Sequence, residues 1–294
     1  MKYLRKKTVP GDIVITGNYH PEGMLSLLSN RETYILAHGA EYLAGKSFFR
    51  RCIWPTYRRF ILRKASCVIA NSHYTETLVK HCSPNAKTIA IPLAVDAIHF
   101  RPTCEKYKDG LLHLCSISRL EKFKGHDFII RTIASLPAKY KQQVRLHLGG
   151  KGKYKSALER MVTDLGLSDI VSFEGFIDDN KLCDFYSASH IFILCTREEA
   201  DNRNVEGYGL VFAEAQACGT AVIGTRTGGI PDAVEENNGG WLIHQDAHEE
   251  LENLLIKLID DKSLAINEGR NARRRIEAKI TWEHYVDQIC DVIL

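Results

Sequence analysis

The chain has 294 residues, of which 45% are hydrophobic and 26% charged, and its net charge is +3. This mixture supplies enough apolar material for two compact domains, and it excludes fibrous, collagen-like and disordered chains. The small net charge also argues against non-specific nucleic-acid binding, which needs a broad basic surface.

Apolar run lengths and cysteine use indicate the expected compartment. The longest apolar stretches, such as residues 254–259, fall far short of the ~20 residues that cross a bilayer. The basic start resembles a signal peptide, but Pro10 and Gly11 follow where its apolar segment should be. The nine scattered cysteines contain no Cys-x-x-Cys pair, which disfavours both a disulfide framework and a zinc site. We therefore expect a cytoplasmic protein.

Apolar runs along the chain predict two series of strands. Four short runs in the first hundred residues predict strands at 12–15, 33–36, 67–69 and 88–91. A denser series predicts strands at 111–117, 144–148, 170–173, 191–194, 221–224 and 241–243. Amphipathic segments between them predict helices at 126–136, 155–165, 180–188, 210–218 and 247–259. This alternation is typical of parallel, doubly wound α/β sheets.

Residues 92–110 are polar and interrupted by proline and glycine, which is typical of a linker. Two α/β units joined there should leave a cleft at the carboxyl ends of their strands, where ligands bind.

Residues 205–219 place two glutamates, Glu206 and Glu214, around a glycine turn that begins a helix. Gly207 lets the backbone approach a ligand closely, and the first amides of the helix form an anion site aided by the helix dipole. These amides belong to Gly209, Leu210 and Val211. By itself the pattern is explained equally well by an ordinary glycine turn with solvated carboxylates.

A cationic loop follows the predicted strand at 111–117. Arg119 and Lys124 lie at the carboxyl edge of the predicted sheet, where both can reach one anion, and a diphosphate fits best. A solvated loop is the alternative explanation.

Together with the Gly-Gly-Ile-Pro loop at 227–232 and Thr281-Trp282-Glu283, these motifs resemble retaining nucleotide-sugar glycosyltransferases of the GT-B fold, glycosyltransferase family 4. The resemblance runs from about residue 11 to the end and is densest at 111–243. It implies an α/β protein with two Rossmann-like domains facing a cleft. The acceptor-side domain would span 1–104 and the nucleotide-sugar domain 105–280, with a C-terminal helix at 281–294 packing back on the first.

The resemblance also assigns roles. It implies that Arg119 and Lys124 hold the donor diphosphate and neutralise charge as the glycosidic bond breaks. Glu206 would bind hydroxyls of the donor sugar, and Glu214 would accept hydrogen bonds from the ribose. His38 matches the family's cleft histidine and is the leading catalytic candidate, with a histidine fixed at a strand end as the alternative.

Backbone contacts complete the implied donor site. Residues 209–211 would meet the distal phosphate or sugar, and the loop with Phe176 and Ile177 would hold the nucleobase. The insertion at 197–204 resembles that of mannosyltransferases that act on phosphatidylinositol mannosides.

We expect neither a metal nor another cofactor. The chain contains no Asp-x-Asp, and the aspartate pairs at 178–179 and 260–261 fall at predicted helix boundaries. His244 and His248 are four residues apart, but a polar loop entering a helix explains them. The resemblance implies retention, with the acceptor attacking from the face of the departing diphosphate and without a protein nucleophile. The glycine-rich residues 149–153 complete no phosphate-binding pattern and predict a strand-to-helix turn.

Residues 46–64 combine seven cations and five aromatics without an acid. Such a segment could lie on anionic lipid, or it could be a core helix with an exposed cationic face, interrupted at Pro55. Both interpretations stay open.

The beginning of the chain departs from the family pattern. No strand with a glycine-rich loop precedes Gly11, which predicts a shortened, incomplete N-terminal domain or a fragment, and Asp232 stands where the family often has glutamate. The predicted function is transfer of a hexose-type sugar to a glycan or glycolipid acceptor in cell-surface polysaccharide or lipopolysaccharide biosynthesis. The alternatives are an inactive nucleotide-sugar-binding remnant or partner subunit, or an epimerase of related fold.

Overall fold

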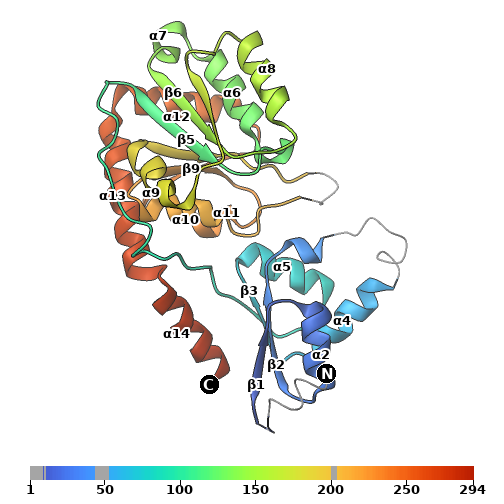
Figure 1. Cartoon of the computed structure of the whole chain (residues 1–294). Helices are drawn as coiled ribbons and strands as arrows, with labels where there is room; N and C mark the ends of the chain where they lie inside the picture. Colours follow the sequence, from blue (N-terminus) through green and yellow to red (C-terminus); the bar gives the residue numbers. More distant parts are fainter. Residues whose placement is uncertain (1–8, 10, 44–52, 200–203) are drawn as a thin grey trace. The chain divides into compact units, whose positions relative to one another are not determined.

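The structure is a computed structural model that describes residues 9, 11–43, 53–199 and 204–294. Contacts divide the chain into two compact units (Figure 1). Unit 1 comprises Met1–Leu93, Glu198–Tyr208 and Gln288–Leu294, and unit 2 comprises Ala94–Arg197 and Gly209–Asp287. Residues 94–104, assigned to the first domain by the sequence prediction, therefore group with unit 2.

Unit 1 is built on a parallel sheet with the order β1-β2-β3-β4. The strands are β1 (Ile13–Thr16), β2 (Glu32–Ala37), β3 (Cys67–Ala70) and β4 (Thr88–Ala90). The helical segments are η1 (Tyr19–Gly23), α2 (Met24–Leu28), η2 (Ala40–Tyr42), α4 (Trp54–Lys64) and α5 (His73–Cys82). The four predicted strands are thus confirmed to within one or two residues.

The core of unit 1 lies between one face of this sheet and its helices. Ile35 of β2 and Val68 of β3 pack with Ile61 and Leu62 of α4 and Val79 of α5. Alternate strand residues point to one face, so a short apolar strand supplies two such contacts, and the buried residues of the helices cover them.

Unit 2 contains six parallel strands in the order β10-β9-β8-β5-β6-β7. They are β5 (Leu112–Ile117), β6 (Val144–Gly149), β7 (Val171–Gly175), β8 (Ile191–Leu194), β9 (Ala221–Thr225) and β10 (Gly240–Ile243). The order begins at β5, runs outward to β7 and returns to β8 on the other side. The carboxyl ends of β5 and β8 therefore lie at the point where the strand order reverses, which is where such sheets bind ligands.

Helices cover both faces of the larger sheet. The helical segments of unit 2 are η3 (Lys122–Lys124), α6 (His126–Ser135), α7 (Ala138–Lys141), α8 (Lys155–Asp164), α9 (Asp179–Ala188), α10 (Leu210–Ala217), α11 (Ile230–Ala233), α12 (His248–Asp260) and α13 (Lys262–Lys279). They are followed by α14 (Trp282–Ile293), which buries no residue and whose last residues group with unit 1.

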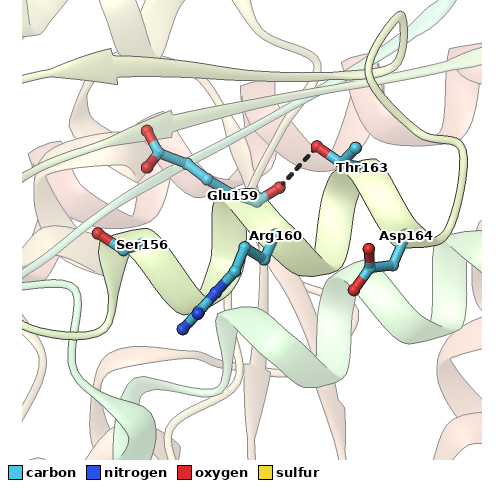
Figure 2. Close-up of a pocket in the computed structure, with 5 residues that line it drawn as sticks. All are labelled: Ser156, Glu159, Arg160, Thr163 and Asp164. Carbon is cyan, nitrogen blue, oxygen red and sulfur yellow. Dashed lines mark hydrogen bonds between the residues drawn. The ribbon is translucent and has the colours of Figure 1, made fainter.

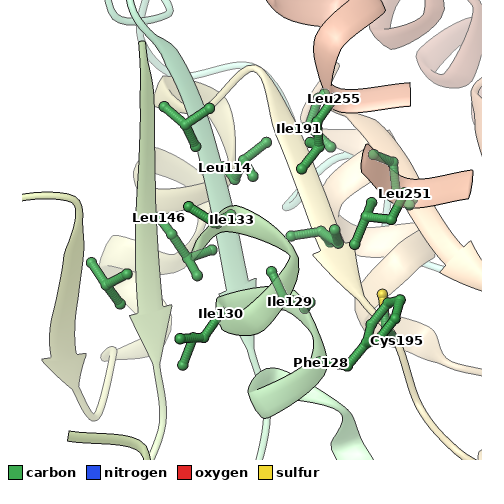
Figure 3. Close-up of a cluster of buried hydrophobic side chains, with 14 of the residues drawn as sticks. Leu114, Phe128, Ile129, Ile130, Ile133, Leu146, Ile191, Cys195, Leu251 and Leu255 are labelled. Atoms are coloured by element: carbon green, nitrogen blue, oxygen red, sulfur yellow. The ribbon is translucent and has the colours of Figure 1, made fainter. Parts of the chain in front are cut away.

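The main core of unit 2 lies under α6 and α12 (Figure 3). Leu114 and Leu146 on the strands meet Ile129 and Ile133 of α6 and Leu255 of α12. These side chains are fully buried, which is the main source of stability for a unit of this kind.

The opposite face of the sheet is aromatic. The ring centre of Phe192 of β8 lies 5.6 Å from that of Tyr186 of α9 and 5.3 Å from that of Phe212 of α10, and both pairs pack edge to face. Its neighbours Ile191 and Ile193 belong to the core under α6 and α12. Strand β8 is thus buried on both faces, which explains its uniformly apolar sequence.

Two sequence expectations need correction. Helix α13 was not predicted, because its polar sequence carries only a weak apolar stripe. Pro55 does not interrupt a helix but lies in the first turn of α4, where a missing N–H costs nothing. The predicted residues 46–52 lie outside the described part.

The predicted linker is fixed onto unit 2 through Lys106, whose Nζ donates to the carbonyl of Ser189 at 2.7 Å. Burial lowers the pKa of this amine to about 8.

Among the helices in the described part of the chain, none combines the length and the apolar character that crossing a membrane requires.

Candidate donor-binding site

The loop after β5 presents the two predicted cations. Arg119 is exposed and its guanidinium pairs with Glu121 at 2.7 Å. Lys124 closes the short helix η3, and its Nζ lies 5.1 Å from the centre of the Phe123 ring. Both cations therefore lie on one loop at the switch point of the sheet.

Neighbouring strand ends fix the shape of this loop. Leu120 N–H donates to the carbonyl of Lys151 at 2.9 Å, and Tyr154 N–H donates to the carbonyl of Leu120 at 3.0 Å. A side chain at Gly152 would overlap the carbonyl oxygen of Leu120. The glycine-rich residues 149–153 thus form the predicted strand-to-helix turn, and their glycines admit the neighbouring loop.

Gly125 brings the same loop against the end of β8. Its φ is +77°, and a Cβ there would overlap the carbonyl oxygen of Cys195. Only glycine satisfies both conditions, which explains the Lys-Gly pair physically.

Arg197 anchors the loop and was missed by the sequence analysis. Its guanidinium donates to both oxygens of Asp127, at 2.8 and 3.2 Å, and its Nε donates to Asp246 at 2.7 Å. Its N–H donates to the carbonyl of Phe123 at 2.6 Å. Only the separation of 70 positions between Arg197 and Asp127 hid this pair from the sequence.

His126 follows the loop and is fully buried. Burial, reinforced by the nearby Lys124 cation, lowers the pKa of this imidazole to about 4. His126 is therefore neutral at physiological pH and adds no charge to the site.

The start of α10 carries the residues that are expected to bind an anion. Gly209 precedes the helix with φ +92°, a left-handed conformation that favours glycine. Leu210 and Val211 occupy the first turn, where amides lack a partner within the helix, and Leu210 is 41% exposed.

Glu214 lies one turn further along α10 and is largely buried. Tyr186 Oη donates to its carboxylate at 2.9 Å. Burial raises the pKa of Glu214, and the Tyr186 hydrogen bond opposes that shift by stabilising the charged form.

The expected nucleobase loop follows β7. Phe176 is 62% exposed, with the Lys151 ammonium 5.3 Å from its ring centre. Ile177 is half buried and contacts Gly149 at the end of β6.

The remaining predicted residues belong to unit 1. His38 follows β2 with an exposed side chain, and its N–H donates to Glu41 Oε1 at 2.7 Å. Gly207 approaches so closely that a side chain there would overlap the carbonyl oxygen of His38. Within unit 1, the loop of Glu206 and Gly207 therefore lies against the backbone of His38.

The histidines at the start of α12 have separate structural partners. His244 Nδ1 pairs with Glu250 at 2.8 Å, and His248 Nδ1 hydrogen-bonds Thr132 Oγ1 at 2.7 Å. The Asp261 carboxylate caps α13 by accepting from Ser263 N–H at 3.0 Å. The absence of a resident metal stays a prediction.

One hollow of about 450 Å³ lies on the exposed side of α8 (Figure 2). It is lined by Ser156, Glu159, Arg160, Thr163 and Asp164. None of the predicted site residues lines it, and its charged side chains are those of an ordinary solvated helix face.

Comparison with known proteins gives the family. The model of the glycosyl transferases group 1 family matches residues 105–275, which include the cationic loop and α10. The chain belongs to this family.

Similar proteins support the same assignment. A "GDP-mannose-dependent monoacylated alpha-(1-6)-phosphatidylinositol monomannoside mannosyltransferase" of Corynebacterium glutamicum is 30% identical over 213 residues, which cover 69% of this chain and 55% of that protein. This family member thus spans about half the length of the curated relatives it matches.

Two solved structures show the fold. Sucrose-phosphate synthase from Thermosynechococcus elongatus has a TM-score of 0.80 and 24% identity, covering 99% of this chain and 75% of its own. Anabaena HepE in complex with UDP has a TM-score of 0.79 and 21% identity, with coverages of 99% and 80%. The predicted α/β fold of GT-B type, with a parallel sheet in each unit, is confirmed, whereas the cleft and the incomplete N-terminal domain stay predictions.

Proposed function

We propose that this family member carries out hexosyl transfer from a nucleotide diphosphate sugar to a glycan or lipid-linked acceptor, with retention at the anomeric carbon and without a metal. The observation that carries the proposal is the cationic loop at the switch point, held there by Gly125 and Arg197. A fixed pair of cations at that position suits the diphosphate of a donor.

In unit 2, Arg119 and Lys124 bind the diphosphate and neutralise the charge that develops on it as the glycosidic bond breaks. The amides of Leu210 and Val211 add donors whose dipole favours the same anion. Such preorganised donors stabilise the leaving group electrostatically. Glu214, kept in place by Tyr186, accepts hydrogen bonds from the ribose, and the loop of Phe176 and Ile177 receives the base.

In unit 1, Glu206 binds hydroxyls of the donor sugar and His38 lies beside the transferring sugar. The acceptor hydroxyl forms its bond to the anomeric carbon on the face that the diphosphate leaves, and a diphosphate oxygen takes the proton. No protein nucleophile takes part.

The relatives suggest the donor and the acceptor. The matched Corynebacterium and Mycobacterium proteins are named as GDP-mannose-dependent enzymes acting on phosphatidylinositol monomannosides. We therefore propose GDP-mannose as the first donor to test and a glycolipid as the first acceptor, and we retain a role in cell-surface polysaccharide or lipopolysaccharide synthesis as the wider setting.

Titration calorimetry without divalent metal tests the donor site. We expect GDP or UDP to bind with micromolar affinity, and Glu214→Ala to weaken binding at least tenfold. Glu159→Ala, on the solvated face of α8, is the matched control and should bind normally. Failure of every nucleotide to bind would contradict the proposal.

Radiolabelled GDP-mannose with a phosphatidylinositol-mannoside extract then tests transfer. Nucleotide binding without transfer to any acceptor would favour the alternative of a binding remnant or partner subunit. Unchanged transfer after removal of metal by EDTA is expected; a strict metal requirement would contradict the metal-free mechanism.

Helix α4 supports a peripheral membrane contact. Ile61 and Leu62 are buried, whereas Arg59, Phe60 and Arg63 are exposed on the other side. Each such cation adds about 1 kcal/mol near an anionic surface. Flotation with phosphatidylserine vesicles should recover the protein, and Arg59→Glu with Arg63→Glu should abolish recovery. Equal flotation of both proteins would leave α4 as a core helix with a cationic face.

A further inference from the structure

A hydrogen bond across 135 positions holds the loop that carries Glu206. Ser72 Oγ donates to the carbonyl oxygen of Gly207 at 2.6 Å. Ser72 is fully buried and lies between the end of β3 and the start of α5. Water does not compete for a hydrogen bond at such a buried site, so the bond fixes its acceptor firmly.

The Ser72 hydroxyl has a single proton, and its neighbours indicate that Gly207 receives it. Its Oγ caps α5 by accepting from Thr75 N–H at 3.0 Å, and it lies 3.1 Å from Thr75 Oγ1. A serine hydroxyl has one proton to donate, and Gly207 O is its nearest acceptor. Of the two acceptors in reach of this proton, the Gly207 carbonyl at 2.6 Å is closer than Thr75 Oγ1 at 3.1 Å, so the proton goes to Gly207.

Glycine is required at position 207 because the backbone of His38 comes close to it, and not because of its backbone angles. Its φ lies outside the left-handed region, so other residues could adopt its conformation. A Cβ would nevertheless overlap the carbonyl oxygen of His38. That same oxygen accepts a hydrogen bond from Asn71 Nδ2 at 3.2 Å.

A second contact holds Glu198, which precedes Glu206 in the chain. Tyr74 Oη, in the first turn of α5, donates to Glu198 Oε1 at 2.9 Å. Burial raises the pKa of Tyr74, so its hydroxyl remains a donor. Ser72 and Tyr74, at the start of one helix, thus hold Gly207 and Glu198.

We propose that Ser72 is a positioning residue for Glu206, acting through the Gly207 carbonyl, and that this junction fixes Glu206 and His38 as one element that recognises the donor sugar. The proposal rests on the proposed function, in which Glu206 binds the sugar. It assigns sugar recognition to a main-chain junction within unit 1. Ser72 itself does not touch the donor.

Three variants separate positioning from helix capping. Ser72→Ala removes both the hydrogen bond to Gly207 and the cap of α5. Ser72→Thr keeps a hydroxyl and should restore the unmodified behaviour. Asp261→Ala removes a comparable cap, on α13, and serves as the matched control. Ser72→Cys keeps the size with a much weaker donor and replaces Ser72→Ala if that variant does not fold.

Binding is measured for GDP and UDP and, separately, for GDP-mannose and UDP-glucose. Ser72→Ala should bind the nucleoside diphosphate within twofold of the unmodified protein but lose about tenfold to hundredfold in affinity for its sugar form. This is the size expected when hydrogen bonds to a carboxylate are lost. Equal weakening for both ligands, or no weakening for either, would overturn the proposal.

Hydrogen–deuterium exchange tests whether Ser72 holds Gly207 in place, and it needs no ligand. Peptides covering 204–208 should exchange faster in Ser72→Ala than in the unmodified protein, Ser72→Thr or Asp261→Ala. If no nucleotide binds the unmodified protein, the proposed function fails, yet this comparison still tests the hold on Gly207. Unchanged exchange at 204–208 would overturn the inference even where nucleotide binding is strong.

Discussion

The loop 118–125 in unit 2 and the loop 206–207 in unit 1 are held in different ways. The first is fixed by the ends of neighbouring strands and by Arg197, which pairs with two carboxylates. The second depends on one buried serine and on the absence of a side chain at Gly207. Charged ligand groups need cations at a defined place, which ion pairs and turns provide. Sugar hydroxyls need a carboxylate aimed in one direction, which the backbone provides.

The largest effect should come from removing a cation that we propose to bind the donor diphosphate. Lys124→Ala should lower turnover by roughly 10²–10³, as loss of one charge-stabilising donor does. Lys122→Ala, an exposed neighbour on the same loop, is the control and should stay within threefold. Steady-state transfer kinetics measure both, and a Lys124→Ala enzyme within threefold of the unmodified one would remove Lys124 from the mechanism.

Removing the anchor of that loop should cost stability. Arg197→Met leaves the buried carboxylate of Asp127 without its partner, and we expect a loss of about 3 kcal/mol in the free energy of unfolding. Arg226→Met is the matched control, because its pair with Glu236 is exposed by 40% and 38% and should contribute less than about 1 kcal/mol. Urea unfolding compares them; equal losses would show that Arg197 is not an anchor.

In unit 1 the comparable change is the addition of one methyl group. Gly207→Ala should cost about 1–3 kcal/mol, because the Cβ forces the loop away from His38. A Cβ at Gly17, in the same unit, meets nothing within 4 Å, so Gly17→Ala should be neutral or slightly stabilising. Thermal unfolding of both variants is the measurement, and similar melting temperatures would argue against the close approach at residue 207.

Per pH unit, the smallest effect is a pH dependence in unit 2. The pKa of His126 is about 4 in the folded chain and about 6.5 in the unfolded chain. Between these two pH values the unfolded chain binds a proton at His126 and the folded chain does not. Stability is therefore complete above about pH 6.5 and falls through this window, by at most about 1.4 kcal/mol per pH unit.

His126→Gln should flatten this dependence, whereas His81→Gln, an exposed residue of α5, should not. Urea unfolding at several pH values measures the slope. Identical slopes for His126→Gln and the unmodified protein would contradict a neutral buried imidazole.

The amino-acid sequence by itself determined the strands of this protein and the residues that are candidates for its site. Short apolar runs predicted all ten strands, because burial against helices requires such runs wherever they lie in the sheet. The cations at 119 and 124, the glycine turn and Glu214 were visible because their roles depend on local order: a loop after a strand, or amides at the start of a helix. Helices α5 and α13 were not predicted from the sequence.

Only the tertiary structure decided what holds these groups. Arg197 and Asp127 are 70 positions apart, and Ser72 and Gly207 are 135 apart, so no local pattern relates them. The same holds for the glycines at 125 and 207, whose need for hydrogen in place of a side chain comes from carbonyl oxygens of other strands and loops. A sequence specifies which groups are present, but contacts between distant segments, such as that of Gly207 with the His38 carbonyl, form only in the folded chain.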